Sequence, residues 1–267
     1  MYKIIIAFLI VFISNSISSK DIIVIDAQKS FSEKKALVIL NGFGDSKKNR
    51  KIQKEYFCSK GYDLFILDYI EKSSLKNTQD KFNKLYDFHK LSKYKEVSFF
   101  CYIIGGYVLN EFLKVNYKKN IKTILYDRSP IQERAAKVAR DKLQLISFLI
   151  YGRVLKDFSE ISFSSLDKKF DVRVGLIIEN KATRLMRIFE KQALSYGPLD
   201  FSPYKINNNH DDFIHTILDH DLMYRRFDII GNEIIHFLEF GVFTEKAKRI
   251  KYNLNPFKKV KDYDIYL

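Results

Sequence analysis

The amino-acid sequence predicts an α/β fold, a three-layer α/β/α sandwich with a mainly parallel sheet and a small helical lid. Apolar runs rich in branched residues alternate with amphipathic segments along residues 36–126. Strict alternation of strand and helix favours a parallel sheet that helices cover on both faces. The chain has 267 residues, of which 46% are hydrophobic, and this is enough for one domain with a substantial core.

The first half of the chain contains most of the expected sheet. Five apolar runs are predicted strands, at residues 21–26, 36–40, 64–67, 96–102 and 121–126. Helices are predicted between them at 46–59, 80–91 and 106–115. Ser46 can cap the first of these helices and Gly61 ends it. The second helix presents apolar residues at spacings of three to four, the period of an amphipathic helix.

The second half departs from this alternation before returning to it. Residues 130–169 are helical and irregular in pattern, as expected for a lid inserted after a strand. A strand at 172–178 and a helix at 183–194 follow. Residues 198–206 are predicted as a loop with a short strand, 207–212 as a polar turn, and 222–240 as the last helix.

The two ends of the chain differ from the domain between them. Lys3 precedes an apolar run at 4–13 and small polar residues at 14–19, which is typical of a secretory signal peptide or an N-terminal anchor. We therefore expect a protein that is exported, to the periplasm or outside the cell, or anchored by its N-terminus. The domain spans 20–245, and 246–267 is a basic tail and a candidate for weak order.

The composition narrows the classes of partner and cofactor. The net charge is +14, but lysine is spread along the whole chain and no nucleic-acid signature occurs, so no nucleic-acid partner is expected. Peripheral membrane contact through the basic tail stays open. No phosphate-binding glycine motif is present, so no cofactor is expected. His210, His215 and His220 are spaced by five, which separates them on a helix, so no metal site is expected.

One stretch, residues 99–113, reads F-F-C-Y-I-I-G-G-Y-V-L-N-E-F-L and predicts a strand, a sharp turn and a helix. A second, N-G-F-G-D-S at 41–46, follows an earlier strand. Together they resemble the α/β-hydrolase fold family, whose members carry G-x-S-x-G at the turn and often H-G-F-G-D-S in the loop. Here Ile103 stands at the position of the nucleophilic serine and Asn41 at that of the loop histidine. The resemblance covers about residues 36–240.

The resemblance implies roles for several residues. The backbone N–H groups of Phe43 and Ile104 would form the oxyanion hole, and Gly42 would border the ligand. His210, in the polar turn before the last helix, would be the catalytic histidine. Ile103 has no hydroxyl or thiol to form an acyl intermediate. Cys101 lies two residues too early, at the end of the strand, which favours a buried thiol over a nucleophile.

The acid of the triad has two candidates. Asp127 follows one strand and Glu179 follows the next, both at the expected carboxyl edge of the sheet, where open α/β folds bind ligands. Asp127 can equally form a structural ion pair with Arg128. Ser129, which precedes Pro130, can contact a ligand or cap a helix.

The sequence leaves two functions open. The first is a non-catalytic or weakly active member of this fold that binds a small ligand or a partner. The second is an active hydrolase of esters or related acyl compounds, in which His210 activates water or a nucleophile from outside the turn, such as Ser46 or Ser129. The oligomeric state is not predicted. A weaker third function is a basic protein that acts through its tail.

Overall fold

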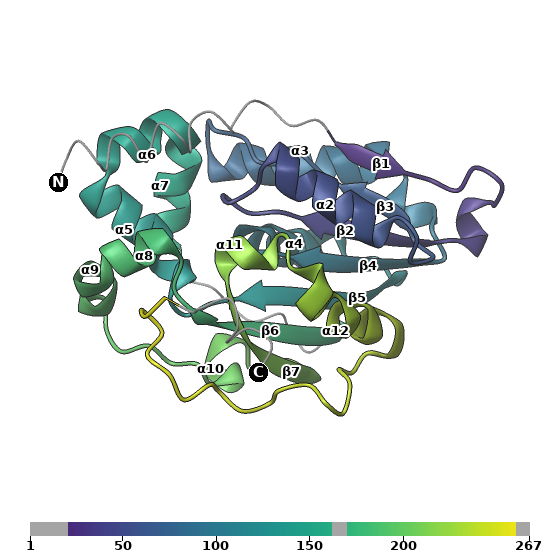
Figure 1. The fold of residues 1–267 in the computed structure, drawn as a ribbon. Helices are drawn as coiled ribbons and strands as arrows, with labels where there is room; N and C mark the ends of the chain where they lie inside the picture. The colour runs from purple at the N-terminus through teal and green to yellow at the C-terminus, as the bar shows by residue number, and fades with distance from the viewer. Residues whose placement is uncertain (1–20, 162–169, 260–267) are drawn as a thin grey trace.

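The computed structural model describes residues 21–161 and 170–259 and contains a seven-stranded sheet (Figure 1). The order of its strands across the sheet is β1-β3-β2-β4-β5-β6-β7, and only β1 is antiparallel to its neighbour. In chain order the strands are β1 (Ile22–Val24), β2 (Lys35–Leu40), β3 (Asp63–Ile66), β4 (Glu96–Cys101), β5 (Ile121–Arg128), β6 (Arg173–Lys181) and β7 (Asp212–Asp219).

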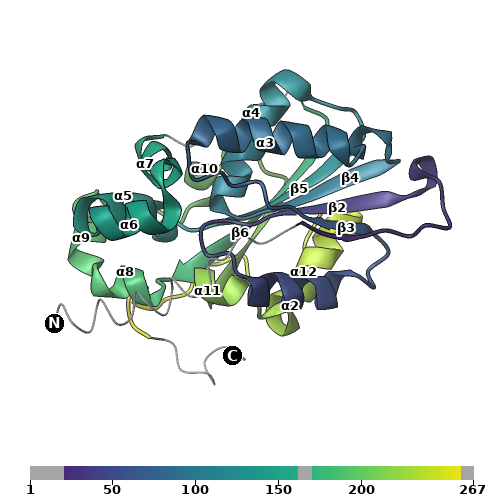
Figure 2. The ribbon, with the colours of Figure 1, turned by 90° about the horizontal axis from the view of Figure 1, so that it is seen from above.

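Helices cover both faces of this sheet, as Figure 2 shows. On one face α3 (Leu75–Phe88) and α4 (Ile103–Asn116) bury apolar side chains, and on the other α2 (Lys47–Phe57) and α12 (Phe227–Phe240) do so. The central strands are buried on both faces, which explains their nearly continuous apolar sequence. The predicted three-layer sandwich with a mainly parallel sheet is confirmed.

Local signals set the limits of several helices. The Ser46 hydroxyl accepts a hydrogen bond from the N–H of Asn49 and begins α2, as expected. Ser74 caps α3 in the same way through Asn77, so this helix begins five residues earlier than its apolar pattern indicated. Gly241 ends α12 with a positive φ of 75°, a conformation that glycine adopts at low cost.

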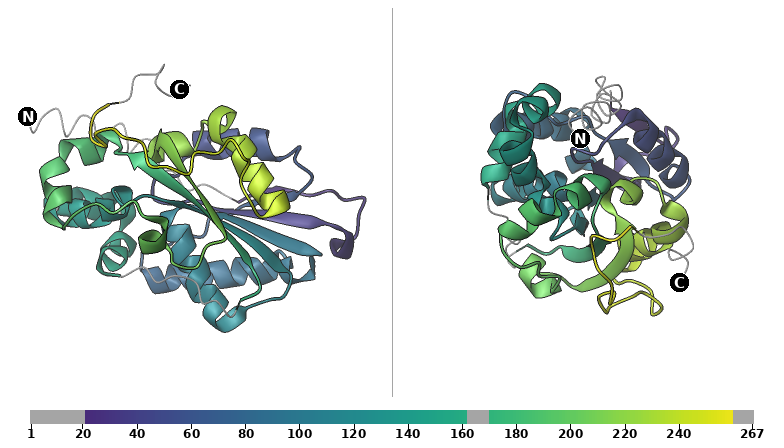
Figure 3. Two further views of the ribbon diagram at one scale, coloured as in Figure 1. Left: turned by 90° about the horizontal axis from the view of Figure 1, so that it is seen from below. Right: turned by 60° about the vertical axis from the view of Figure 1, so that its left-hand side comes forward.

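The predicted lid is a group of short helices beyond the carboxyl ends of the strands (Figures 1 and 3). It comprises α5 (Ala135–Lys142), α6 (Gln144–Tyr151) and α7 (Arg153–Glu160). Two further helices, α8 (Arg184–Ile188) and α9 (Glu190–Ser195), follow β6 and adjoin them. Residues 162–169, the end of the predicted lid, lie outside the described residues.

The structure corrects the prediction between residues 198 and 223. The expected short strand is instead the helix α10 (Pro203–Ile206), and Asp212–Asp219 forms β7, a strand that the sequence interpretation missed. A short helix, α11 (His220–Met223), then precedes α12. Consequently the polar turn at 207–212 leads into the last strand, and the segment that follows this strand begins at His220.

The described part of the basic tail packs on the domain. The N–H of His215 in the edge strand β7 donates to the carbonyl of Lys248 at 2.7 Å, and the N–H of Ala182 donates to that of Pro256 at 3.0 Å. Phe257 is buried. Residues 246–259 therefore cover the edge of the sheet, a common means of protecting unpaired strand groups, and the expectation of weak order is wrong for them.

The predicted N-terminal signal peptide or anchor, residues 1–19, lies outside the described residues. Among the residues that the structure describes, none of the helices combines the length and the apolar character that crossing a membrane requires.

Candidate active site

The turn between β4 and α4 has no residue in a strained backbone conformation. Tyr102 caps α4 with φ −76°, and Ile103 is the first residue of the helix. Among the described non-glycine residues only Lys90 has a positive φ, so Ile103 sits in ordinary backbone. A β-branched side chain tolerates strained dihedrals badly, and here the turn is unstrained. The Ile103 side chain is 6% exposed and borders a pocket.

The glycine pair that follows is explained by packing. A Cβ atom at Gly105 would lie 2.6 Å from the Cβ of Leu40 and closer still to its carbonyl oxygen, and one at Gly106 would lie 2.9 Å from the ring of Tyr126. Helix α4 therefore approaches β2 and β5 too closely for any side chain at these positions. Close packing therefore accounts for both glycines without reference to a nucleophile.

Two backbone donors without an acceptor among the described residues border the pocket, one in the loop after β2 and one in α4. The N–H of Gly42 donates to the hydroxyl of Tyr224 at 2.9 Å, which occupies it. The N–H groups of Phe43 and Ile104 have no acceptor among the described residues, and both residues line the pocket. The second lies in the first turn of α4, where backbone donors have no partner within the helix. The predicted oxyanion residues are thus brought to one cavity.

Asn41 fixes this loop through its side chain. Its amide nitrogen donates to Asp45 at 3.0 Å and to Gln53 at 2.9 Å. Arg50 in turn pairs with Asp45. Asn41, at the position of the family's loop histidine, is therefore part of a buried network that shapes the loop, and burial explains the raised pKa of Asp45 against the opposing effect of Arg50.

His220, the residue directly after β7, forms the polar centre of the site. Its Nδ1 lies 2.6 Å from Oε1 of Glu179 and 3.4 Å from Oδ2 of Asp127. The carboxylates come from β6 and β5, and both side chains are fully buried. Nε2 has no hydrogen-bond partner among the described residues, and His220 lines the pocket. Three neighbouring parallel strands thus deliver a histidine and two acids to one place.

The net charge of this cluster depends on which of its groups bind protons. Burial raises the pKa of Glu179 well above 4.5, and the nearby charge of Asp127 raises it further. Burial lowers the pKa of His220, but the charges and hydrogen bonds of Glu179 and Asp127 outweigh it and leave this pKa well above 6.5. Both shifts favour the protonated forms, an imidazolium at His220 and a neutral carboxyl group at Glu179.

The same three residues are the group of potential metal ligands in the described chain, with donor atoms within 4.8 Å of one another. The sequence interpretation excluded a metal by considering only the spacing of three histidines. A cation about 2.1 Å from each donor needs donors about 3 Å apart or more. The 2.6 Å contact between His220 and Glu179 leaves no such space. As arranged, the cluster holds a proton between these groups.

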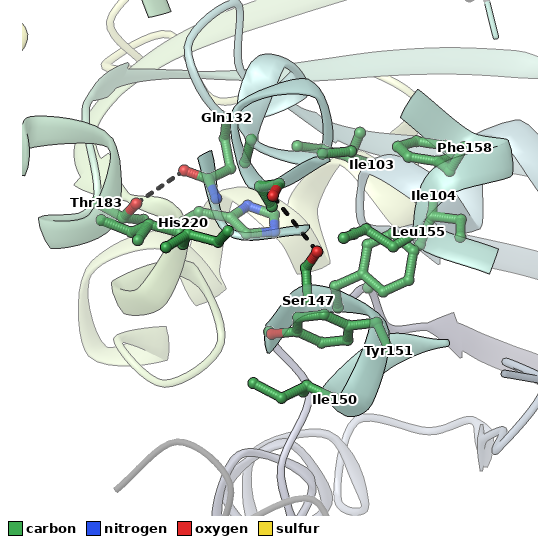
Figure 4. A pocket seen from close by; sticks show the side chains of 18 of the residues that line it. Ile103, Ile104, Gln132, Ser147, Ile150, Tyr151, Leu155, Phe158, Thr183 and His220 are labelled. Atoms are coloured by element: carbon green, nitrogen blue, oxygen red, sulfur yellow. Dashed lines mark hydrogen bonds between the residues drawn. The ribbon is translucent and has the colours of Figure 1, made fainter. Parts of the chain in front are cut away.

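The pocket above His220 has a volume of about 220 Å³. Its walls come from the lid, from the loop after β2 and from the first turn of α4, and Figure 4 shows Ile103, Ile104 and His220 around it. Most of the lining is apolar. The polar side chains at its border include Ser147, whose hydroxyl donates to Gln144, and Thr183, which donates to Gln132.

His210, the predicted catalytic histidine, is not in this site. It precedes β7, at the opposite end of the strand from His220, and its Nδ1 bonds to the carbonyl of Asn207 at 2.7 Å. It does not line the pocket. The strand β7 was not predicted, so the sequence interpretation chose the histidine before this strand, and the structure places the one after it at the pocket. His220 and Tyr224 were not identified as site residues.

The remaining predicted residues have structural roles. The Ser129 hydroxyl accepts from the N–H of Gln132 at 3.1 Å, as in the predicted helix cap, and Ser129 is fully buried and does not border the pocket. Arg128 pairs with Glu133 at 2.6 Å, whereas Asp127 faces His220. Cys101 is buried, which raises the pKa of its thiol.

Several solved structures are similar to this chain, although no protein-family model and no curated protein matches it. A structure of the metagenome-derived lipolytic enzymes LipS and LipT has a TM-score of 0.54 and 7% identity, covering 83% of this chain and 98% of that one. An α/β-hydrolase fold protein from Chitinophaga pinensis has 0.52 and 8%, covering 84% and 98%.

An esterase from Pyrococcus furiosus gives a TM-score of 0.48 at 15% identity, covering 85% of this chain and 90% of that one. At these identities the similarity bears on the fold alone. The seven-stranded, mostly parallel sheet, its helical layers and the two neighbours with TM-scores of 0.54 and 0.52 together establish that the chain has the α/β-hydrolase fold.

Proposed function

We propose that this protein binds a small acyl compound, a short-chain ester or carboxylic acid, and does not hydrolyse it. The observation that carries the proposal is Ile103, an aliphatic side chain at the position where this fold places its nucleophile, on the border of a pocket that is otherwise complete. Without an oxygen or sulfur atom at this position no acyl intermediate can form.

The walls of the pocket suit such a ligand. The two free N–H groups, from Phe43 and Ile104, can donate to a carbonyl or carboxylate oxygen. His220 can donate from Nε2 to the same head group when it is protonated. The apolar wall formed by the lid can receive an aliphatic chain, and the volume of about 220 Å³ favours a short one.

The state of His220 also argues against efficient hydrolysis. A histidine that activates water must be neutral in order to accept a proton. The pKa of His220 is raised well above 6.5 by its two carboxylate neighbours, so the imidazolium is favoured at neutral pH. The second acid, Asp127, thereby stabilises a state that binds anions and cannot act as a base.

A second candidate function, slow hydrolysis by water, has one observation in its favour. His220 and Glu179 retain the arrangement of a catalytic histidine and its acid, with Nδ1 facing the acid and Nε2 free. Triad enzymes that lack their catalytic residues still accelerate the reaction about 10³–10⁴-fold relative to the reaction in water, through the oxyanion hole and substrate binding. The base would be His220 and not His210.

Calorimetric titration with hexanoate and with methyl hexanoate tests the proposal. We expect saturable 1:1 binding of one or both ligands. Ala135, which lines the pocket and is only half-buried, offers a blocking variant. Ala135→Phe should abolish binding, whereas Ala27→Phe, at an exposed site far from the pocket in sequence, should leave it unchanged. Absence of binding to the wild type, or equal binding to Ala135→Phe, would refute the proposal.

A further inference from the structure

The lid carries the densest group of exposed apolar side chains among the described residues. Within five positions of α6, Leu145 is 81% exposed, Phe148 60% and Leu149 75%. Spacings of three and four place them on one helix face. Elsewhere in the described chain comparable residues occur singly, such as Phe88 on α3 and Val115 on α4, or as the pair Phe240 and Val242. Scattered apolar residues are ordinary, but a contiguous group marks a contact surface.

The opposite face of the same helix forms part of the pocket. Ile146, Ser147 and Ile150 line the cavity, and Figure 4 shows the latter two on its wall. Helix α6 is therefore apolar on its inner and its outer side, although only one side is buried by the protein. A helix that is apolar all round is normally buried all round, so the outer side, which we call the α6 patch (Leu145, Phe148 and Leu149), lacks a partner within the described chain.

Two basic side chains lie in a groove beside the α6 patch. Leu145 and Phe148 border a groove together with Arg140 and Lys156. The one carboxylate in this groove, that of Asp141, is paired with Arg140 at 2.8 Å. Lys156, like Lys142 one turn before the patch, has no carboxylate partner among the described residues and is exposed. The helices α5 to α7 carry five basic and three acidic residues.

We propose that the α6 patch docks this protein on the surface of an anionic lipid bilayer. Large apolar side chains would enter the boundary between head groups and acyl chains, while the lysines and arginines at the rim would contact anionic head groups. Lys142 and Lys156 have long flexible stems that reach a charged surface while the helix lies flat on it.

The size of the patch favours a bilayer over a protein partner. A stable protein interface buries about 800 Å² on each side. Three side chains on an eight-residue helix present much less, whereas interfacial insertion needs only a few apolar anchors and a cationic rim. The proposal stands independently of whether the pocket holds an acyl compound. If both hold, the ligand would enter beside a lipid surface.

Vesicle sedimentation tests this proposal directly. The full chain is mixed with phosphatidylcholine vesicles that contain either a quarter phosphatidylglycerol or none, and the bound fraction is measured. We expect binding to the anionic vesicles. In the triple variant Leu145→Gln/Phe148→Gln/Leu149→Gln the partition coefficient should fall at least about tenfold. Lys142→Gln/Lys156→Gln should reduce the preference for anionic vesicles by about fivefold for each lysine.

The matched control is Phe88→Gln/Val115→Gln, which removes equally exposed apolar side chains from α3 and α4. It should bind as the wild type does. All variants keep the same N-terminal apolar run, so its contribution cancels in the comparison. Equal binding by the triple variant and the wild type would overturn the proposal. So would concentration-dependent self-association through the patch without lipid, detected by analytical ultracentrifugation and abolished in the triple variant.

Discussion

The turn between β4 and α4 and the cluster around His220 adjoin the same pocket. Different interactions hold the two regions in place. At the turn, Gly105 and Gly106 still allow α4 to approach the sheet, while Ile103 supplies no reactive atom. At the cluster, Nδ1 of His220 still faces Glu179 at 2.6 Å. Packing maintains the first region. The second region is held together by electrostatic pairing of buried groups, because removing one partner leaves an uncompensated buried charge.

The largest effect should come from removing the cation of the cluster. In His220→Leu two buried acids lose their positive partner, and we expect a loss of about 3–5 kcal/mol in the free energy of unfolding at about pH 6. Denaturant titrations at several pH values measure it. Because the pKa of His220 is raised in the folded protein, the stability that His220 contributes is present below about pH 6.5, its unfolded pKa, and is lost as pH rises through its folded pKa. The deficit of His220→Leu should therefore be full near about pH 6 and shrink as the pH is raised into the alkaline range.

Asp127→Asn is the matched comparison for this cluster. It removes one of the two buried acids and leaves the bond between His220 and Glu179 in place. We expect a loss below about 1 kcal/mol, or a gain, because one buried acid no longer needs a proton. The pKa of His220 should fall, as followed by NMR of its ring protons. A loss of unfolding free energy as large as that of His220→Leu would contradict this expectation. It would show that His220 needs both acids and that Glu179 alone is not a sufficient partner.

Within the turn, a substitution at Gly105 should reduce the free energy of unfolding the most. A Cβ there would overlap the backbone of Leu40, and backbone cannot move aside as a side chain can. We expect Gly105→Ala to cost about 3 kcal/mol of unfolding free energy. Gly106→Ala meets only the ring of Tyr126 and should cost about 1 kcal/mol. Equal stability of Gly105→Ala and the wild type in chemical denaturation would contradict the packing account.

A second buried histidine, His215 on β7, sharpens the contrast with His220. Its Nδ1 accepts from the amide of Asn180 at 3.0 Å, so it is neutral. Burial, with the charge of Lys251, lowers its pKa to about 4. The unfolded chain takes up a proton near pH 6.5 and the folded chain only near 4, so stability should fall between these values as pH decreases, by about 2–3 kcal/mol. In His215→Gln this part of the pH dependence should vanish, while the contribution of His220 remains.

A small effect is expected at Tyr224, which links the two regions. Its hydroxyl accepts from the N–H of Gly42, and its ring stacks on Tyr102 at 4.0 Å. Tyr224→Phe should cost about 1 kcal/mol by leaving a buried donor unpaired. Thermal unfolding detects this change, and Tyr86→Phe, which loses a hydroxyl without a partner, should be neutral or stabilising.

The sequence predicted the sheet better than the site. Continuous apolar runs such as 36–40 and 96–101 are unambiguous, because central parallel strands are buried on both faces. The strand β7 contains two polar residues, His215 and Thr216, within its buried stretch D-F-I-H-T-I-L-D. These residues interrupt the apolar pattern, so the strand was not predicted. Because this one strand was missed, the histidine chosen for the site was His210 and not His220.

Other parts of the site could not be obtained from local patterns. Both candidate acids, Asp127 and Glu179, were recognised as alternatives, but only the order of strands shows that they meet at one histidine. The tail was interpreted from its charge, whereas its order comes from backbone hydrogen bonds to β7 and to Ala182. Composition carries no information about such contacts.

The central claim is that the pocket holds an acyl compound without cleaving it. The most direct test is native mass spectrometry of the protein with methyl hexanoate over several hours, with His220→Ala in parallel. We predict a non-covalent 1:1 complex, intact ester in solution, and no mass increase on the denatured chain. Methanol release or an acyl adduct that disappears in His220→Ala would contradict the account and establish a hydrolase.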